Sequence, residues 1–138
     1  MLLKTRDFGE IEFPKSDVIT LVQPLYGFEE YKTFALLSDS NTEGYLSWLQ
    51  STTDESICFI LINPEAFQID YNFDLDDHYV VKLGNGDYSV WLISVIKEPF
   101  INSTVNLRSP IIINQNNGKA IQAMLDSDYP VRFPIYSN

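Results

Sequence analysis

Apolar and polar residues alternate along much of the chain with the two-residue period of β-strands rather than the longer period of a helix. In segment 8–13, Ile11 and Phe13 fall on one face while Glu10 and Glu12 fall on the other. Strands are predicted at 8–13, 17–23, 33–37, 45–49, 57–62, 88–96, 111–113 and 120–125. Short strands at this spacing predict an all-β, mainly antiparallel sandwich or barrel.

Two Asn-Gly pairs mark turns. Asn117-Gly118 lies between the last two predicted strands and predicts a hairpin, because both residues accept a positive φ. The segment before Asn85-Gly86 has two interpretations. Residues 76–83 form either a short helix capped by one of its first aspartates or the first strand of a second hairpin. The acidic start favours the helix and the β-branched pair Val80-Val81 favours the strand, so the pattern leaves both open.

Composition narrows the class of protein. With 138 residues, 45% of them hydrophobic, the chain is expected to form a single compact domain over residues 1–138. Nine Lys and Arg against nineteen Asp and Glu give a net charge of −10, which argues against direct nucleic-acid binding and favours basic protein partners. The longest apolar run, 57–62, is too short for a membrane span, and one cysteine forms no internal disulfide. We therefore expect a cytoplasmic protein that does not associate with a membrane.

The negative charge is concentrated in one part of the chain. Residues 33–81 contain nine acidic residues and no Lys or Arg. This stretch is either a solubilising surface or a docking face for a basic partner. Within it, carboxylates that flank an aromatic residue are the candidates for partner contacts, since tyrosine offers a large contact area at a low entropic cost. The predicted partner-binding residues are Asp70, Tyr71, Asp74, Asp76 and Asp77.

Candidate catalytic and metal-binding residues are scarce. His78 is the only histidine, and Cys58 lies within an apolar run where a buried, unreactive thiol is expected. The run from Asp70 to Asp76 places oxygen ligands at alternate positions, as the first half of a calcium loop does. Leu75 and Val81 stand where such a loop needs Gly and Glu, so a solvated strand edge is the better interpretation. We predict no catalytic residues, no metal and no cofactor.

Five segments, in order along the chain, resemble motifs of the FliW family of bacterial flagellar assembly factors. They are Phe8-Gly9-Glu10-Ile11, Leu25-Tyr26-Gly27-Phe28-Glu29, Trp48-Leu49-Gln50-Ser51 with the Phe59, Asn63-Pro64 and Asp70-Tyr71 that follow it, the run from Asn106 to Asn114, and Tyr129-Pro130-Val131-Arg132. The chain departs from the family pattern at Gln23-Pro24, where a Glu-Gly pair is more usual, and at Ser109, where a small Ala is usual. The resemblance covers nearly the whole chain.

The resemblance implies a small closed or partly closed β-barrel-like domain with one or two short helical segments, one of them near residues 76–83. It implies a regulator that binds flagellin and antagonises the translational repressor CsrA, thereby relieving repression of flagellin translation. The alternative is a flagellin-specific export chaperone without CsrA binding. A monomer is expected, because the acidic charge opposes self-association.

Most of the matching residues are expected to serve the fold. Gly27 fits a turn that needs an unusual φ, and Trp48 fits the core. Asn106 and Asn114 flank Pro110 and are expected to satisfy backbone groups near it. Arg132 is expected to form an internal ion pair. The predicted fold-motif residues are Gly27, Phe28, Trp48, Gln50, Asn106, Pro110, Asn114 and Arg132.

Overall fold

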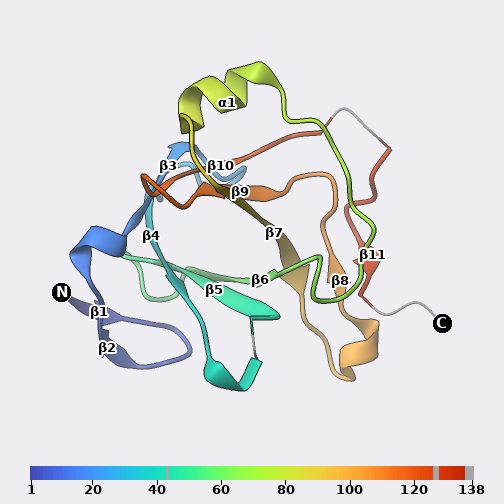
Figure 1. Cartoon of the computed structure of the whole chain (residues 1–138). Helices are drawn as coiled ribbons and strands as arrows, with labels where there is room; N and C mark the ends of the chain where they lie inside the picture. The colour runs from blue at the N-terminus through green and yellow to red at the C-terminus, as the bar shows by residue number, and fades with distance from the viewer. Residues whose placement is uncertain (43, 126–127, 136–138) are drawn as a thin grey trace.

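The computed structural model, which describes residues 1–42, 44–125 and 128–135, shows a closed barrel of seven strands (Figure 1). Around the barrel the strand order is β7, β6, β5, β4, β3, β10 and β9, and β9 pairs again with β7. The strands are β3 (Ile19–Gln23), β4 (Thr33–Leu37), β5 (Leu46–Ser51), β6 (Cys58–Ile62), β7 (Tyr88–Val95), β9 (Ile111–Asn114) and β10 (Lys119–Gln122). This confirms the all-β, barrel-like prediction.

One pairing in the barrel is parallel. Strand β10 runs parallel to β3, with Ala120 opposite Leu21, and the register shifts at the next residue, where Ile121 lies opposite Gln23. All the other pairings in the barrel are antiparallel. The predicted Asn117-Gly118 hairpin joins β9 to β10, and Gly118 has a φ of 73°. The mainly antiparallel prediction is therefore confirmed, but the alternation did not reveal the parallel pair.

Two smaller structures extend from the barrel (Figure 1). Strand β8 (Thr104–Val105) pairs with the end of β7, and β11 (Phe133–Pro134) pairs with β8, which forms an arm beside the barrel. Strands β1 (Leu2–Lys4) and β2 (Glu10–Glu12) form a separate hairpin near the N-terminus. Short 3₁₀ helices lie in the connections: η1 (Lys15–Asp17), η2 (Ser40–Thr42) and η3 (Phe100–Asn102).

The barrel interior holds the main core. Its centre is formed by Phe34, Leu49, Leu61 and Ile111, whose side chains are all fully buried. Each comes from a different strand, so the core depends on the whole ring rather than on one hairpin.

A second apolar cluster lies on the outer face of β7, β9 and β10, where helix α1 (Asp77–Leu83) covers it. Tyr79 and Leu83 are buried there against Ile112 and Ile121. The helix begins after the N-cap residue Asp76 and ends at Gly84, which has a φ of 78°. The helical interpretation of residues 76–83 is therefore confirmed. No helix in the described part of the chain is long and apolar enough to cross a membrane.

The predicted strands correspond to observed ones. The prediction 33–37 matches β4 at both ends, and the others differ by one to a few residues. The segment 8–13 is reduced to β2, and 120–125 ends early as β10. Strands β1, β8 and β11 were not predicted, since two or three residues are too few to show a periodic pattern.

Ile111→Ala is expected to lower the free energy of unfolding by about 2–5 kcal/mol, because it leaves a cavity in the main core. Urea denaturation followed by tryptophan fluorescence measures this change as a lower midpoint. Thr20→Ala, on the exposed side of β3, is the control and is expected to stay within about 0.5 kcal/mol of the wild type. Equal midpoints for the two variants would contradict the placement of Ile111.

Candidate functional site

Four of the five predicted partner-binding residues lie on an extended segment that connects β6 to α1, and the fifth, Asp77, is the first residue of α1. We call residues 69–76 the strap. A tight turn precedes the strap and directs it across the barrel. In this turn the Asn63 side-chain oxygen accepts a hydrogen bond from the N–H of Glu65 at 3.1 Å, and the N–H of Ile69 donates to Pro64 O at 3.0 Å. Gln68, with a φ of 56°, completes this turn.

The strap has a strict alternation of buried and exposed side chains. Its inward residues are half-buried and its outward residues are exposed. Ile69 and Tyr71 pack on the cluster around Val105 and Leu107, whereas Phe73 and Leu75 pack on the cluster around Tyr79. The strap therefore joins two outer apolar clusters. The inward residues are Ile69, Tyr71, Phe73 and Leu75, and the outward residues are Asp70, Asn72, Asp74 and Asp76.

Tyr71 has a structural role in addition to any partner contact. Its hydroxyl donates to Leu107 O, and its ring lies 5.1 Å from Phe73 and 5.2 Å from Tyr129, measured between ring centroids. Burial raises the pKa of this hydroxyl well above its usual value. Sequence reasoning missed this packing, because Leu107 and Tyr129 lie far along the chain.

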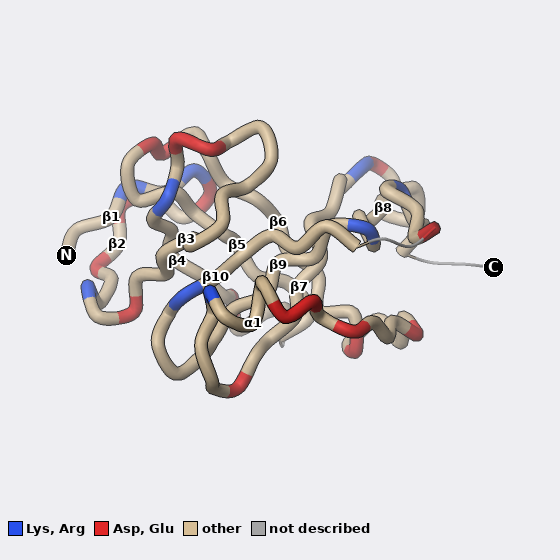
Figure 2. The backbone as a smooth tube through the Cα atoms, turned by 90° about the horizontal axis from the view of Figure 1, so that it is seen from above, with Lys and Arg blue, Asp and Glu red and all other residues tan. Residues whose placement is uncertain are grey.

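The four predicted aspartates are exposed and lie in one region. Asp70, Asp74 and Asp76 project from the outward side of the strap, and Asp77 begins α1. The salt bridges among the described residues are Met1–Glu12 and Arg6–Asp7, so none of these four carboxylates has a cationic partner there. Figure 2 shows their acidic backbone sections at the start of α1 and along the segment that leads to it.

The acidic residues of 33–81 do not all share this face. Asp54 lies in the loop between β5 and β6, where its carboxylate accepts hydrogen bonds from Ser56 and from the Tyr31 hydroxyl. These bonds, chiefly those from Ser56, lower the pKa of Asp54. Figure 2 shows acidic sections on the opposite side of the molecule from α1 as well. Glu43 lies outside the described residues. The strap aspartates are therefore one part of the acidic stretch.

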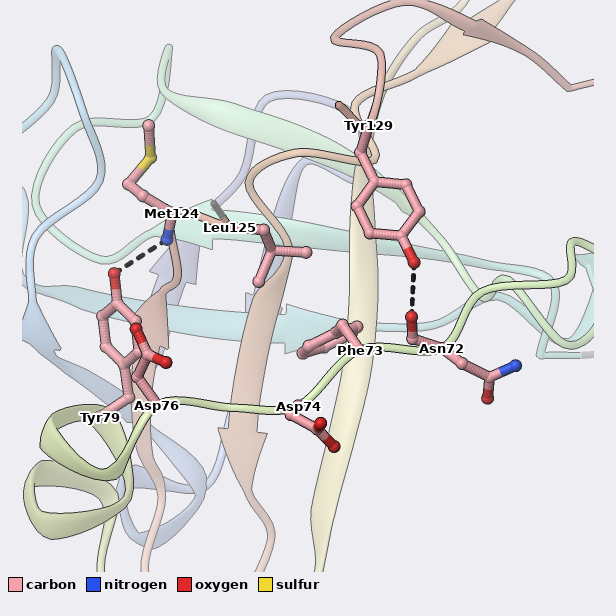
Figure 3. Close-up of a pocket in the computed structure, with 8 residues that line it drawn as sticks. All are labelled: Asn72, Phe73, Asp74, Asp76, Tyr79, Met124, Leu125 and Tyr129. Carbon is pink, nitrogen blue, oxygen red and sulfur yellow. Dashed lines mark hydrogen bonds between the residues drawn. The ribbon is translucent and has the colours of Figure 1, made fainter. Parts of the chain in front are cut away.

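A hollow of about 250 Å³ opens beside the strap (Figure 3). The strap forms one edge, and Met124, Leu125 and Tyr129, which follow β10 in the chain, form the other. The N–H of Met124 donates to the Tyr79 hydroxyl at 2.9 Å, and the Tyr129 hydroxyl donates to Asn72 O. Sequence reasoning did not predict this hollow, whose lining residues are Asn72, Phe73, Asp74, Asp76, Tyr79, Met124, Leu125 and Tyr129.

Three of the fold-motif residues stabilise turns, loops or packing contacts of the fold. Gly27 has a φ of 86°, and its N–H donates to Glu29 Oε1 at 3.0 Å, which lowers the pKa of Glu29. Phe28 packs edge-on against Phe59 at 5.0 Å between centroids. Gln50 is fully buried: its Nε2 donates to carbonyls of the β5–β6 loop and its Oε1 accepts the N–H of Arg6.

Trp48 and Arg132 differ from expectation in their surroundings. Trp48 is only half-buried and lies outside the main core, edge-on against Phe8 at 4.9 Å between centroids, under the β1–β2 hairpin. Arg132 is exposed, and within the described residues it forms no ion pair, so the expected internal pair is absent there. The strand pattern could not show that Trp48 faces the hairpin.

The two asparagines that flank Pro110 have different roles. Asn106 Oδ1 accepts the N–H groups of Arg108 and Ser109, which lead into the buried Pro110, as expected. The expectation was wrong for Asn114, whose Nδ2 donates to the carbonyl of Leu83 at 3.0 Å at the end of α1. It is fully buried and holds the helix end against β9.

The described residues contain no group of three or more His, Cys, Asp or Glu side chains that is arranged to hold a metal ion. Cys58 is buried, and this burial raises the pKa of its thiol to about 11. His78 is exposed on α1 and lies against the Tyr79 ring at 3.9 Å between centroids.

The fold closely matches a solved structure. The crystal structure described as the flagellar assembly factor FliW superposes with a TM-score of 0.91 and 30% sequence identity, covering 100% of this chain and 99% of that one. The barrel with its strap and arm is therefore the architecture of flagellar assembly factors.

Sequence relatives identify the family. The family described as "FliW protein" matches residues 2–135. A flagellar assembly factor FliW from Caldicellulosiruptor bescii is 38% identical over 99% of this chain and 91% of its own length. Another from Ruminiclostridium cellulolyticum is 35% identical over 98% of this chain and 94% of its own length. The chain belongs to the FliW family, which confirms the resemblance seen in its motifs.

Alkylation of Cys58 by iodoacetamide at about pH 8 is expected to be about 100-fold slower in the folded protein than in urea. Its raised pKa keeps the thiol protonated, and only the thiolate reacts. The folded-state rate is expected to rise as the pH approaches 11. A folded-state rate equal to that in urea would show that Cys58 is accessible and unperturbed.

Proposed function

We propose that the chain is a regulatory flagellar assembly factor that binds flagellin and antagonises CsrA. In this proposal it relieves repression of flagellin translation through protein contacts rather than catalysis. It acts in the cytoplasm as a monomer whose single domain spans residues 1–138. Family membership over nearly the whole chain supports the assembly role.

The observation that carries the CsrA part of the proposal is the row of exposed strap carboxylates without cationic partners among the described residues. CsrA grips RNA with basic residues, so an acidic surface is complementary to the face that RNA would otherwise occupy. The net charge of −10 adds a long-range attraction for a basic partner and a repulsion for RNA.

Titration calorimetry of this protein against CsrA from the same organism, at two salt concentrations, tests the proposal directly. Saturable binding that weakens as salt rises is expected, because salt screens exposed charges. Binding that does not depend on salt would keep the function but move the interface to apolar residues. Flagellin binding in a parallel titration, together with no binding of CsrA, would favour the export-chaperone alternative.

Asp70→Lys combined with Asp74→Lys is expected to slow association with CsrA by roughly tenfold at low salt and to flatten its salt dependence, because it removes electrostatic steering. These positions are preferred to Asp76, which is the N-cap residue of α1. Stopped-flow kinetics at two ionic strengths measures the effect.

The matched control is Glu30→Lys combined with Glu55→Lys. It makes the same change in net charge at exposed positions away from the strap. Association rates that fall equally in both double variants would mean that net charge, and not the strap, steers the encounter.

A further inference from the structure

Within the described residues, most backbone groups in the middle of the strap have no hydrogen-bond partner. From Asp70 to Leu75, within the described residues, no N–H or C=O bonds to another backbone group, and the one side-chain contact with this backbone is from the Tyr129 hydroxyl to Asn72 O. Such rows of free donors and acceptors are otherwise found on the edge strands of sheets, where they are templates for pairing with another chain.

The strap also has the side-chain pattern of a strand. Its side chains alternate between the barrel surface and solvent. It belongs to no sheet, because it lies on the outer face of the barrel and contacts that face through its side chains.

One edge of the strap faces the hollow. The carbonyl of Asn72 is directed to the hollow, where it accepts the hydrogen bond of the Tyr129 hydroxyl. In an extended chain the N–H and C=O of one residue point to the same edge, as do those of the residue two positions on. The N–H of Asn72 and both backbone groups of Asp74 therefore face the hollow.

The hollow suits a second extended chain. Figure 3 shows the strap along one side and Met124, Leu125 and Tyr129 along the other. Apolar and aromatic side chains line much of it, whereas the carboxylates of Asp74 and Asp76 lie at the strap edge. A strand seated here would place alternate side chains on the apolar lining and the others beside the carboxylates.

We propose that a partner protein binds here by strand addition: an extended segment with alternating basic and apolar side chains pairs with the strap backbone. The free backbone groups supply hydrogen bonds, as in other strand-addition complexes. Charge complementarity selects the occupant, because the outward residues of the strap are three aspartates and one asparagine. Only the assignment of this segment to CsrA or flagellin rests on the proposed function.

The test uses the peptide acetyl-Val-Arg-Val-Arg-Val-amide and two doubly N-methylated derivatives of it, which are isomers of each other. One is N-methylated at both arginines and the other at the last two valines. Each methylation pattern blocks one edge of the peptide strand. Binding to the full chain is followed by ¹H–¹⁵N chemical shifts. The parent peptide is expected to shift the amide signals of Asp74, Tyr79 and Met124. One of the two methylated isomers is expected to bind about tenfold more weakly than the parent peptide, because it loses two backbone hydrogen bonds.

Equal binding of both isomers and the parent peptide would overturn the inference, because side-chain recognition alone does not distinguish the two edges. Absence of shifts at the strap and the hollow would overturn it as well.

A matched pair of variants gives the same test from the protein side. Asn72→Pro removes the N–H that faces the hollow and keeps an extended backbone, whereas Asn72→Ala removes only the exposed side chain. Asn72→Pro, which loses one backbone hydrogen bond, is expected to bind the parent peptide about threefold more weakly than Asn72→Ala, with both variants melting close to the wild type. Equal affinities of the two variants would overturn the inference.

The peptide and the partner titrations separate the two proposals. Peptide binding at the strap, together with no binding of either CsrA or flagellin, would support strand addition and overturn the proposed function. Binding of CsrA without any peptide binding would leave the proposed function in place and overturn strand addition.

Discussion

Closure of the barrel by β9 is the constraint on which the remaining structure depends. Strand β9 pairs with β10 on one side and with β7 on the other, and all its residues are buried. Closure leaves no free edge in the ring, but it creates an outer face on β7, β9 and β10 that carries Val90, Ile112 and Ile121. Such a face must be kept from water, and α1 and the strap cover it. The position of the candidate site is thus a consequence of how the barrel closes.

Local sequence patterns predicted the elements that are long and regular. Strands β4 and β6 stand out because apolar residues run between polar clusters. The β9–β10 hairpin stands out because Asn117-Gly118 accepts a positive φ, which Gly118 adopts. Propensity left α1 open between helix and strand. The outcome depends on Tyr79 and Leu83 packing against strands distant in sequence, which no local pattern contains. The parallel contact of β10 with β3 was missed for the same reason: it joins segments from opposite ends of the chain.

In the candidate site, too, local features could be predicted from the sequence and contacts between distant segments could not. Exposure of the strap aspartates follows from their alternation with apolar residues, so the sequence was informative about them. The hollow is a different matter, because Met124 and Tyr129 reach the strap only once the chain has closed the barrel and returned past α1. Tyr71 shows the limit most clearly. Its neighbours in sequence suggest a free anchor among carboxylates, whereas its neighbours in space hold the hydroxyl and the ring.

The strap covers an apolar surface of the barrel but leaves its own backbone exposed. Its inward side chains cover the apolar outer face, but it lies outside the sheet. From Asp70 to Leu75 its backbone therefore has no backbone partner within the described residues. A long unpaired strand edge normally invites association with an identical copy. Antiparallel or parallel, a second strap would bring aspartates against aspartates across the pairing, and like charges directly opposite are destabilising. The same carboxylates attract a segment that carries basic residues. Acidic residues at alternate positions of the strap therefore oppose pairing of two straps and favour a basic partner at the strap edge. They do so without altering the inward residues that cover the barrel.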